Sequence, residues 1–151
     1  MPGRKTKLSV EISIHNAQRR VRLSRSRMAA FAKRALEICR QIPASRPWPA
    51  EEISVVFVSD RTIAAVHKQF MSIPGPTDVI TFQHGEIVIS AETARRQARQ
   101  FGTSLERELR LYLVHGLLHL RGYDDKTKRG AETMRRLQEK VLRRLDREGT
   151  V

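Results

Sequence analysis

The chain has 151 residues, of which 29 are Lys or Arg and 16 are Asp or Glu, so its formal net charge is +13. Such a basic chain favours a polyanionic partner, and its length suits one domain over residues 1–151 that buries about two thirds of its unfolded surface. Cys39 is the only cysteine, which excludes an internal disulfide framework and a zinc site closed by thiolates. No apolar run reaches the roughly 20 residues that cross a bilayer, so we expect a cytoplasmic protein without a membrane partner.

The first part of the chain predicts a strand followed by a long helix. Residues 8–16 alternate apolar and polar side chains, as a half-buried strand does. Ser24 can cap a helix that runs to about Arg40, because apolar side chains recur there at helical spacing. Prolines in residues 42–49 then predict a loop, in which we expect Trp48 to anchor the backbone on the core.

The middle of the chain predicts a strand, a short helix and a β-hairpin. The strand is rich in β-branched residues and ends at a candidate helix cap, Ser59 or Asp60. A turn around Gly75 separates the helix from two short β-rich runs, which we expect to pair as a hairpin. The expected elements are residues 52–60, 61–70, 78–82 and 86–90.

Three helices complete the chain. Ser90 can start one that Gly102 ends, and Thr103 or Ser104 opens a second that is apolar nearly all round and should be buried. The last is a basic helix from about Lys126 to Arg147. The succession of strands and helices predicts an α+β fold in which a small mixed sheet of four strands packs against about five helices.

The positive charge lies at the two ends of the chain. Residues 1–46 hold 12 Lys and Arg against 2 acidic residues, and residues 121–151 hold 10 against 6. Residues 47–120 are nearly neutral, with 7 against 8. Terminal helices beside a functional cleft would offer these cations to a phosphate backbone, so RNA is the expected partner ahead of an anionic membrane. The eight aromatic residues show no stacking platform, so recognition is expected to rest on backbone and shape.

The run HGLLHLRGYDD, residues 115–125, carries the candidate metal ligands. His115 and His119 are four residues apart, which places their side chains on one face of a helix. Gly122 permits the backbone turn that ends the helix, and Asp125 then supplies a carboxylate. Three protein ligands leave a fourth position open, as in catalytic zinc sites. The alternative is a pair of core histidines, but unpartnered imidazoles on a buried helix would be costly.

This run resembles the HGxLHLxGYDH signature of the YbeY family, bacterial metal-dependent endoribonucleases of ribosomal RNA maturation. PTDVITF in residues 76–82 resembles the family's PTDVLSF, and GEIVIS in residues 85–90 resembles its GDIVI segment. The resemblance spans residues 53 to 140. It implies a compact metalloprotease-like (zincin-like) domain and one divalent ion, zinc first, held by His115, His119 and Asp125.

Two residues depart from the family pattern. The family's third histidine is Asp125 here, which replaces a nitrogen ligand by an oxygen ligand and leaves the metal's identity open. Met71 occupies the position where the family usually has an arginine that contributes to RNA cleavage. A methionine cannot bind phosphate, so Lys68 and Arg121 are the nearest candidates for phosphate contacts.

The resemblance implies a single-strand-specific metallo-endoribonuclease of ribosomal RNA processing and ribosome quality control, acting at the 3′ end of the small-subunit (16S) RNA. Ribosomal RNA and the ribosome are then its partners, with a ribosomal protein or a GTPase as a further candidate. The alternative is an RNA-binding ribosome-assembly factor with a structural metal, which Met71 keeps open. A peptidase is disfavoured because Gly116 stands where HExxH proteases have their general base. The sequence assigns neither a general base nor an oligomeric state.

Overall fold

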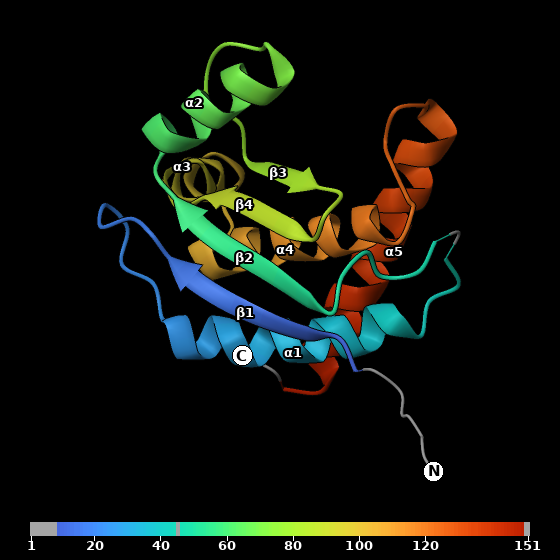
Figure 1. Ribbon diagram of the computed structural model, residues 1–151. Helices are drawn as coiled ribbons and strands as arrows, with labels where there is room; N and C mark the ends of the chain where they lie inside the picture. Colours follow the sequence, from blue (N-terminus) through green and yellow to red (C-terminus); the bar gives the residue numbers. More distant parts are fainter. Residues whose placement is uncertain (1–8, 45, 150–151) are drawn as a thin grey trace.

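The computed structural model describes residues 9–44 and 46–149 of the chain. The order of its elements is the one that the sequence predicts (Figure 1). They are β1 (Glu11–Asn16), α1 (Arg25–Arg40), β2 (Glu52–Val58), α2 (Asp60–Met71), β3 (Val79–Phe82), β4 (Glu86–Ser90), α3 (Ala91–Phe101), α4 (Leu105–Leu120) and α5 (Lys128–Arg147). The α+β fold with a four-stranded sheet is therefore confirmed.

Helix starts follow the side-chain caps of the sequence closely. Ser24, Ser59, Ser90 and Ser104 each accept a hydrogen bond from a backbone N–H of the first helical turn. The last helix begins at Lys128 rather than Lys126, because Thr127 is its cap. Each such cap contributes about 1 kcal/mol, and its local nature explains why it could be predicted.

The sheet is mixed, in the order β1-β2-β4-β3. β1, β2 and β4 run parallel, and β3 pairs antiparallel with β4 as the predicted hairpin. One face of the sheet packs on α1 and α4, and α5 packs against these two helices, which together form the main core. The opposite face carries a smaller cluster against α2, which projects above the sheet in Figure 1. The sheet thus has one fully covered face and one partly covered face.

Close packing of α4 on the sheet depends on Gly116. A Cβ atom added there would lie 2.8 Å from two side-chain atoms of Ile87 on β4. The absence of a side chain therefore lets α4 approach β4 until Leu113 and Leu117 are fully buried. Gly116 is thus a packing residue. Its close contact with Ile87 leaves no room for the glutamate that HExxH proteases have at this position.

α2 is held to the body of the protein through its first residue. Asp60 Oδ1 accepts hydrogen bonds of 2.7 Å from the hydroxyls of Ser90 and Thr93, and Oδ2 accepts one of 2.5 Å from Arg96. Burial alone would raise the pKa of Asp60, but the hydrogen bonds from Arg96, Thr93 and Ser90 lower it below its ordinary value. This network joins α2 to α3, while the far end of α2 reaches over the sheet.

Two predictions about single residues of the α1–β2 region are confirmed. Cys39 is fully buried, and burial raises the pKa of its thiol to about 12, so it is a core residue rather than a nucleophile. Trp48 packs on the main core, with the guanidinium of Arg121 4.8 Å from its ring centre. In the part of the chain that the structure describes, no helix is both long and apolar enough to cross a membrane.

Candidate metal centre

The two histidines lie together at the C-terminal end of α4. Their ring centres are 4.7 Å apart, and both side chains are about one-fifth exposed, at 21% for His115 and 23% for His119. Their neighbours on this part of α4 are buried, so the imidazoles occupy a gap in the core where solvent reaches them: Val114, Gly116, Leu117, Leu118 and Leu120. Ligand atoms of His115, His119 and Asp125 all lie within 4.8 Å of one another, so this group could hold a metal ion.

A turn after α4 brings Asp125 to the histidines. Gly122 has φ of 103°, which a side chain would strain, and its N–H donates to the carbonyl of His119. The returning loop lies tightly on α5, where a Cβ at Gly130 would meet the carbonyl oxygen of Asp124 at 2.7 Å. Both glycines are therefore needed for the path of the backbone that carries Asp125.

The distances fit a single small cation. Asp125 Oδ2 is 3.8 Å from His115 Nε2, and Oδ1 is 3.9 Å from His119 Nε2. Tetrahedral zinc ligands at bond lengths of about 2.1 Å lie about 3.4 Å apart. The two histidine–aspartate distances exceed this spacing by about 0.4–0.5 Å, and the widest separation within the group, at most 4.8 Å, exceeds it by up to about 1.4 Å. A small approach of the side chains would therefore complete the coordination geometry and leave a fourth position open to solvent.

Gln138 on α5 orients one of the ligands. Its amide oxygen Oε1 lies 2.5 Å from Nδ1 of His115, and because this oxygen only accepts, Nδ1 donates the hydrogen. Nε2 is then the free nitrogen, on the side of Asp125. Such an outer partner is typical of metal-binding histidines. The sequence analysis missed Gln138, because it is 23 residues from His115 and no local pattern marks it.

The electrostatic setting favours a neutral imidazole at His119. Burial lowers the pKa of His119, and the neighbouring His115 lowers it further, although Asp125 and Asp124 act in the opposite direction. A neutral ring keeps the nitrogen lone pair that a cation needs. His119 is therefore prepared to bind a metal rather than to carry a proton.

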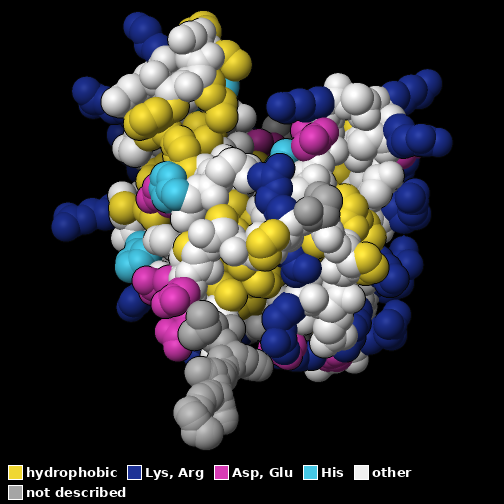
Figure 2. Space-filling view, turned by 45° about the vertical axis from the view of Figure 1, so that its right-hand side comes forward, with side chains coloured by type: hydrophobic (Ala, Val, Ile, Leu, Met, Phe, Trp, Pro, Cys, Tyr) yellow, Lys and Arg dark blue, Asp and Glu magenta, His cyan; other side chains and the backbone are white. Residues whose placement is uncertain are grey.

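The histidines open into a hollow of about 150 Å³ between α4, β3 and the end of α2. Besides His115 and His119, it is lined by Met71, Val79, Ile80 and Thr81. Figure 2 shows the surface notched between the hydrophobic side chains of α2 and the acidic and basic side chains of the α4–α5 loop. Among the described residues, no Lys or Arg side chain lines this hollow.

Comparison with known proteins identifies the family. A sequence profile described as "Endoribonuclease YbeY" matches residues 13–146. Proteins named Endoribonuclease YbeY from Heliobacterium modesticaldum and Geobacter metallireducens are 39% and 32% identical to this chain. The first alignment covers 69% of this chain and 76% of the relative, and the second covers 94% and 100%. The chain belongs to the YbeY endoribonuclease family.

A solved structure supports the fold. The solution structure of TM1509 from Thermotoga maritima matches with a TM-score of 0.60 at 24% sequence identity, over 92% of this chain and 94% of that one. At this level of identity the match concerns the fold alone. It agrees with the mixed sheet and helices described above.

Met71 lies where the YbeY resemblance expects an arginine, and the structure brings it to the histidine pair. Its side chain lines the same hollow as His115 and His119 and is 46% exposed. The position therefore faces the candidate metal, while the residue supplies no charge.

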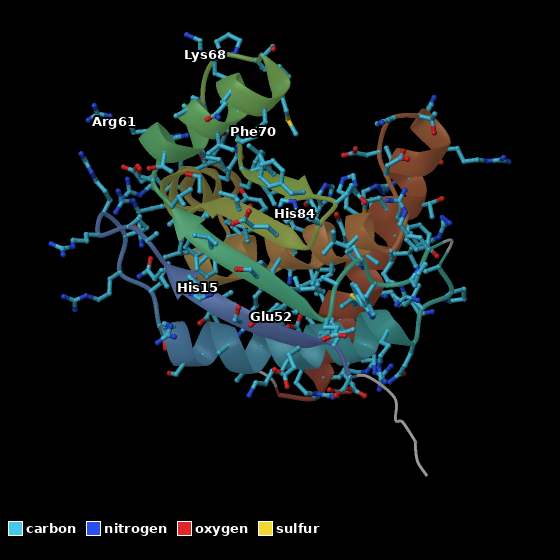
Figure 3. The ribbon with its side chains drawn as sticks, viewed as in Figure 1. His15, Glu52, Arg61, Lys68, Phe70 and His84 are labelled. Atoms are coloured by element: carbon cyan, nitrogen blue, oxygen red, sulfur yellow. The ribbon has the colours of Figure 1, made fainter. Side chains whose placement is uncertain are left out.

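The other two expected phosphate contacts lie elsewhere. Arg121 donates hydrogen bonds of 3.2 Å to the carbonyls of Cys39 and Arg46, so its guanidinium holds the α1–β2 loop. Lys68 is on the exposed side of α2, where Figure 3 shows it pointing away from the sheet. Neither lines the metal hollow. Their role as phosphate contacts stays a prediction, and their positions in the structure do not support it.

Two acidic residues that could in principle act as a general base, Asp124 and Glu86, have local partners. Asp124 accepts a hydrogen bond of 3.1 Å from the backbone N–H of Lys126, as a turn aspartate does. Glu86 lies 3.4 Å from His84 beside the β3–β4 turn. A general base remains unassigned.

Proposed function

We propose that this chain is a metal-dependent endoribonuclease that cuts single-stranded RNA in ribosomal RNA processing. The observation that carries the proposal is that His115, His119 and Asp125 lie together beside an open hollow that both histidines line, in a chain of the YbeY endoribonuclease family. From the family resemblance we further propose the 3′ end of the small-subunit RNA as the target, the ribosome as the setting and the cytoplasm as the location.

The donor set suits a divalent ion, and we propose zinc. Two imidazole nitrogens and one carboxylate oxygen are ligands that zinc accepts in catalytic sites, although the oxygen also suits manganese. When bound, such an ion polarises a phosphoryl oxygen and lowers the pKa of a bound water. The chain's own contribution is to hold the ligands, to orient His115 through Gln138 and to leave one side of the site open.

The surface charge supports an RNA substrate. Exposed cations run along α5, and none of them forms an ion pair within the described part of the chain: Lys128, Arg129, Arg135, Arg136, Lys140, Arg143 and Arg147. Figure 2 shows the corresponding side of the molecule covered by Lys and Arg side chains. Unpaired cations on one face favour a phosphate backbone, with an affinity that falls as salt rises.

The test is cleavage of a single-stranded RNA by protein that has been stripped of metal and then given zinc or manganese. We expect metal-restored cutting by the natural chain, and loss of both metal and cutting in the His119→Ala variant. The Asp125→Ala variant should behave in the same way. Cutting by a metal-free variant would contradict the mechanism.

Met71 favours one alternative, an RNA-binding ribosome-assembly factor whose metal is structural. In that case the protein binds RNA without cutting it under any ion, and metal removal lowers its melting temperature strongly. A ribosomal protein or a GTPase would then be the candidate partner through which the protein acts in ribosome assembly. The cleavage experiment separates the two proposals, because only the nuclease produces cut RNA.

A further inference from the structure

Most of the strongly exposed large apolar side chains lie together at the end of α2. Phe70 is 61% exposed, Met71 46% and Ile73 48%, while Phe101 on α3 is the only other such residue in the described part of the chain. Contiguous exposed apolar surface on a highly charged protein marks a contact site rather than a solvated face. Figure 2 shows this surface continuing from α2 to histidine and acidic side chains lower on the same face.

Phe70 forms part of a small aromatic cluster over the open face of the sheet. Its ring is 5.3 Å from that of Phe82 in an edge-to-face arrangement, and Phe82 stacks on His84 at 5.5 Å with an interplanar angle of 20°. Figure 3 shows Phe70 on α2 and His84 lower in the view, near the β3–β4 turn. The sequence analysis found no stacking platform, because these rings come from separate elements that only the fold unites.

These rings border a hollow of about 270 Å³. Its walls are mostly aliphatic, and its polar groups are Thr62, His84 and Glu86: the complete lining is Val56, Val58, Thr62, Val66, Phe70, Phe82, His84, Glu86 and Val88. Small-ligand sites typically measure roughly 300–1,000 Å³ and combine apolar walls with a few polar groups. This hollow therefore suits one flat, partly polar ring better than a whole peptide segment.

The hollow shares a wall with the metal site. Met71 and Thr81 line the metal hollow, and their sequence neighbours Phe70 and Phe82 line the apolar one. Because successive side chains of a strand point to opposite faces, β3 separates the two spaces by its own thickness. A flexible chain that crosses β3 can therefore reach both spaces at once.

We propose that this hollow receives an unstacked base of single-stranded RNA while the adjoining phosphate lies at the metal hollow. The inference rests on the proposed ribonuclease function, and it identifies an unstacked base as the feature of the RNA that this chain selects. A base in a duplex stays stacked and paired, so only a single strand can turn a base into the hollow. Stacking on aromatic rings is largely independent of sequence, so the rings by themselves set no preference for one base.

The chemistry of the rim favours a base over a second copy of the chain. Glu86 can accept from the amino group of a base, while Thr62 and His84 can donate or accept. The site also adjoins the hollow that would hold the phosphate, as a base site on the same RNA strand requires. A docked second copy would close the metal site to RNA.

The test is RNA binding by metal-free protein, so that no cutting interferes. Fluorescence anisotropy compares a labelled single strand with the duplex of the same sequence, for the natural chain, Phe70→Ala, Phe70→Trp and Phe101→Ala. Phe101 is a matched control, since it is 64% exposed but lies on α3 and does not line the hollow. We expect Phe70→Ala to bind the single strand about tenfold more weakly and the duplex unchanged, whereas Phe70→Trp and Phe101→Ala bind like the natural chain.

A second arm replaces the bases of the single strand by abasic nucleotides, one position at a time. We expect one position to reproduce the tenfold loss in the natural chain and to cause no further loss in Phe70→Ala. Equal effects of Phe70→Ala on single strand and duplex, or no effect, would overturn the inference. So would a dimer of the natural chain that Phe70→Ala abolishes without changing RNA affinity.

The outcome is separate from that of the proposed function. If metal-dependent cutting occurs while Phe70→Ala binds single strands normally, the base site is wrong and the nuclease stands. If the natural chain cuts no RNA under any ion, the nuclease proposal fails whatever Phe70 does.

Discussion

The hydrogen bond between Gln138 and His115 gives a quantitative prediction about metal affinity. Gln138 Oε1 lies 2.5 Å from Nδ1 of His115 and is the side-chain partner that the structure gives this ring. Loss of such an outer contact typically lowers metal affinity about 10–100-fold, which corresponds to about 1.4–2.7 kcal/mol. We expect Gln138→Met, which keeps the length of the side chain but removes the amide, to lie in that range. Gln138→Glu should keep the affinity or raise it, because a carboxylate also accepts.

The assay is competition for zinc with a chromophoric chelator, at one fixed pH for all variants. Glu139→Gln is a suitable control, since this neighbour on α5 is exposed and does not belong to the candidate ligand group. Thermal unfolding of the metal-free proteins should be nearly the same for all variants, which separates a metal effect from a folding effect. Unchanged zinc affinity in Gln138→Met would refute the view that this contact orients His115.

Three other predictions concern the cleft, the core and α2. Met71→Arg should raise single-turnover RNA cleavage about tenfold or more by placing a cation beside the histidines; no gain would argue against a phosphate at this position. Gly116→Ala should destabilise the fold by about 1 kcal/mol in urea titrations, because contact with Ile87 costs more than the gain in helix propensity, and adding Ile87→Val should relieve part of the contact. Asp60→Asn should cost about 2 kcal/mol at pH 7. Because the pKa of Asp60 is lowered on folding, its stabilisation is present above the ordinary carboxyl pKa and is lost as the pH falls. The loss of unfolding free energy that Asp60→Asn causes, measured by urea titration, should therefore become smaller towards pH 3. A loss that stays constant with pH would contradict a role for the charged Asp60 carboxylate.

Local chemistry explains which elements could be predicted. Serine caps, the glycine after α3 and alternating apolar residues act within a few positions of one another, so the order and approximate bounds of the elements follow from the sequence. The metal ligands belong to this class as well, since four residues of helix and one turn bring them together. Their assignment as ligands stays a prediction that metal-binding measurements will test.

The order of strands and helices, the family and the group that could hold a metal could all be predicted from the amino-acid sequence. The tertiary structure decided the parallel pairing of β1, β2 and β4, the contact of Gln138 with His115 and the place of Met71 in the hollow. It also decided that Phe70 and Phe82 meet over the sheet. These contacts join separate elements, and their geometry depends on how α2 and α5 pack around the sheet and α4. No short-range sequence pattern predicts these contacts, because they form only when elements far apart in the sequence pack together.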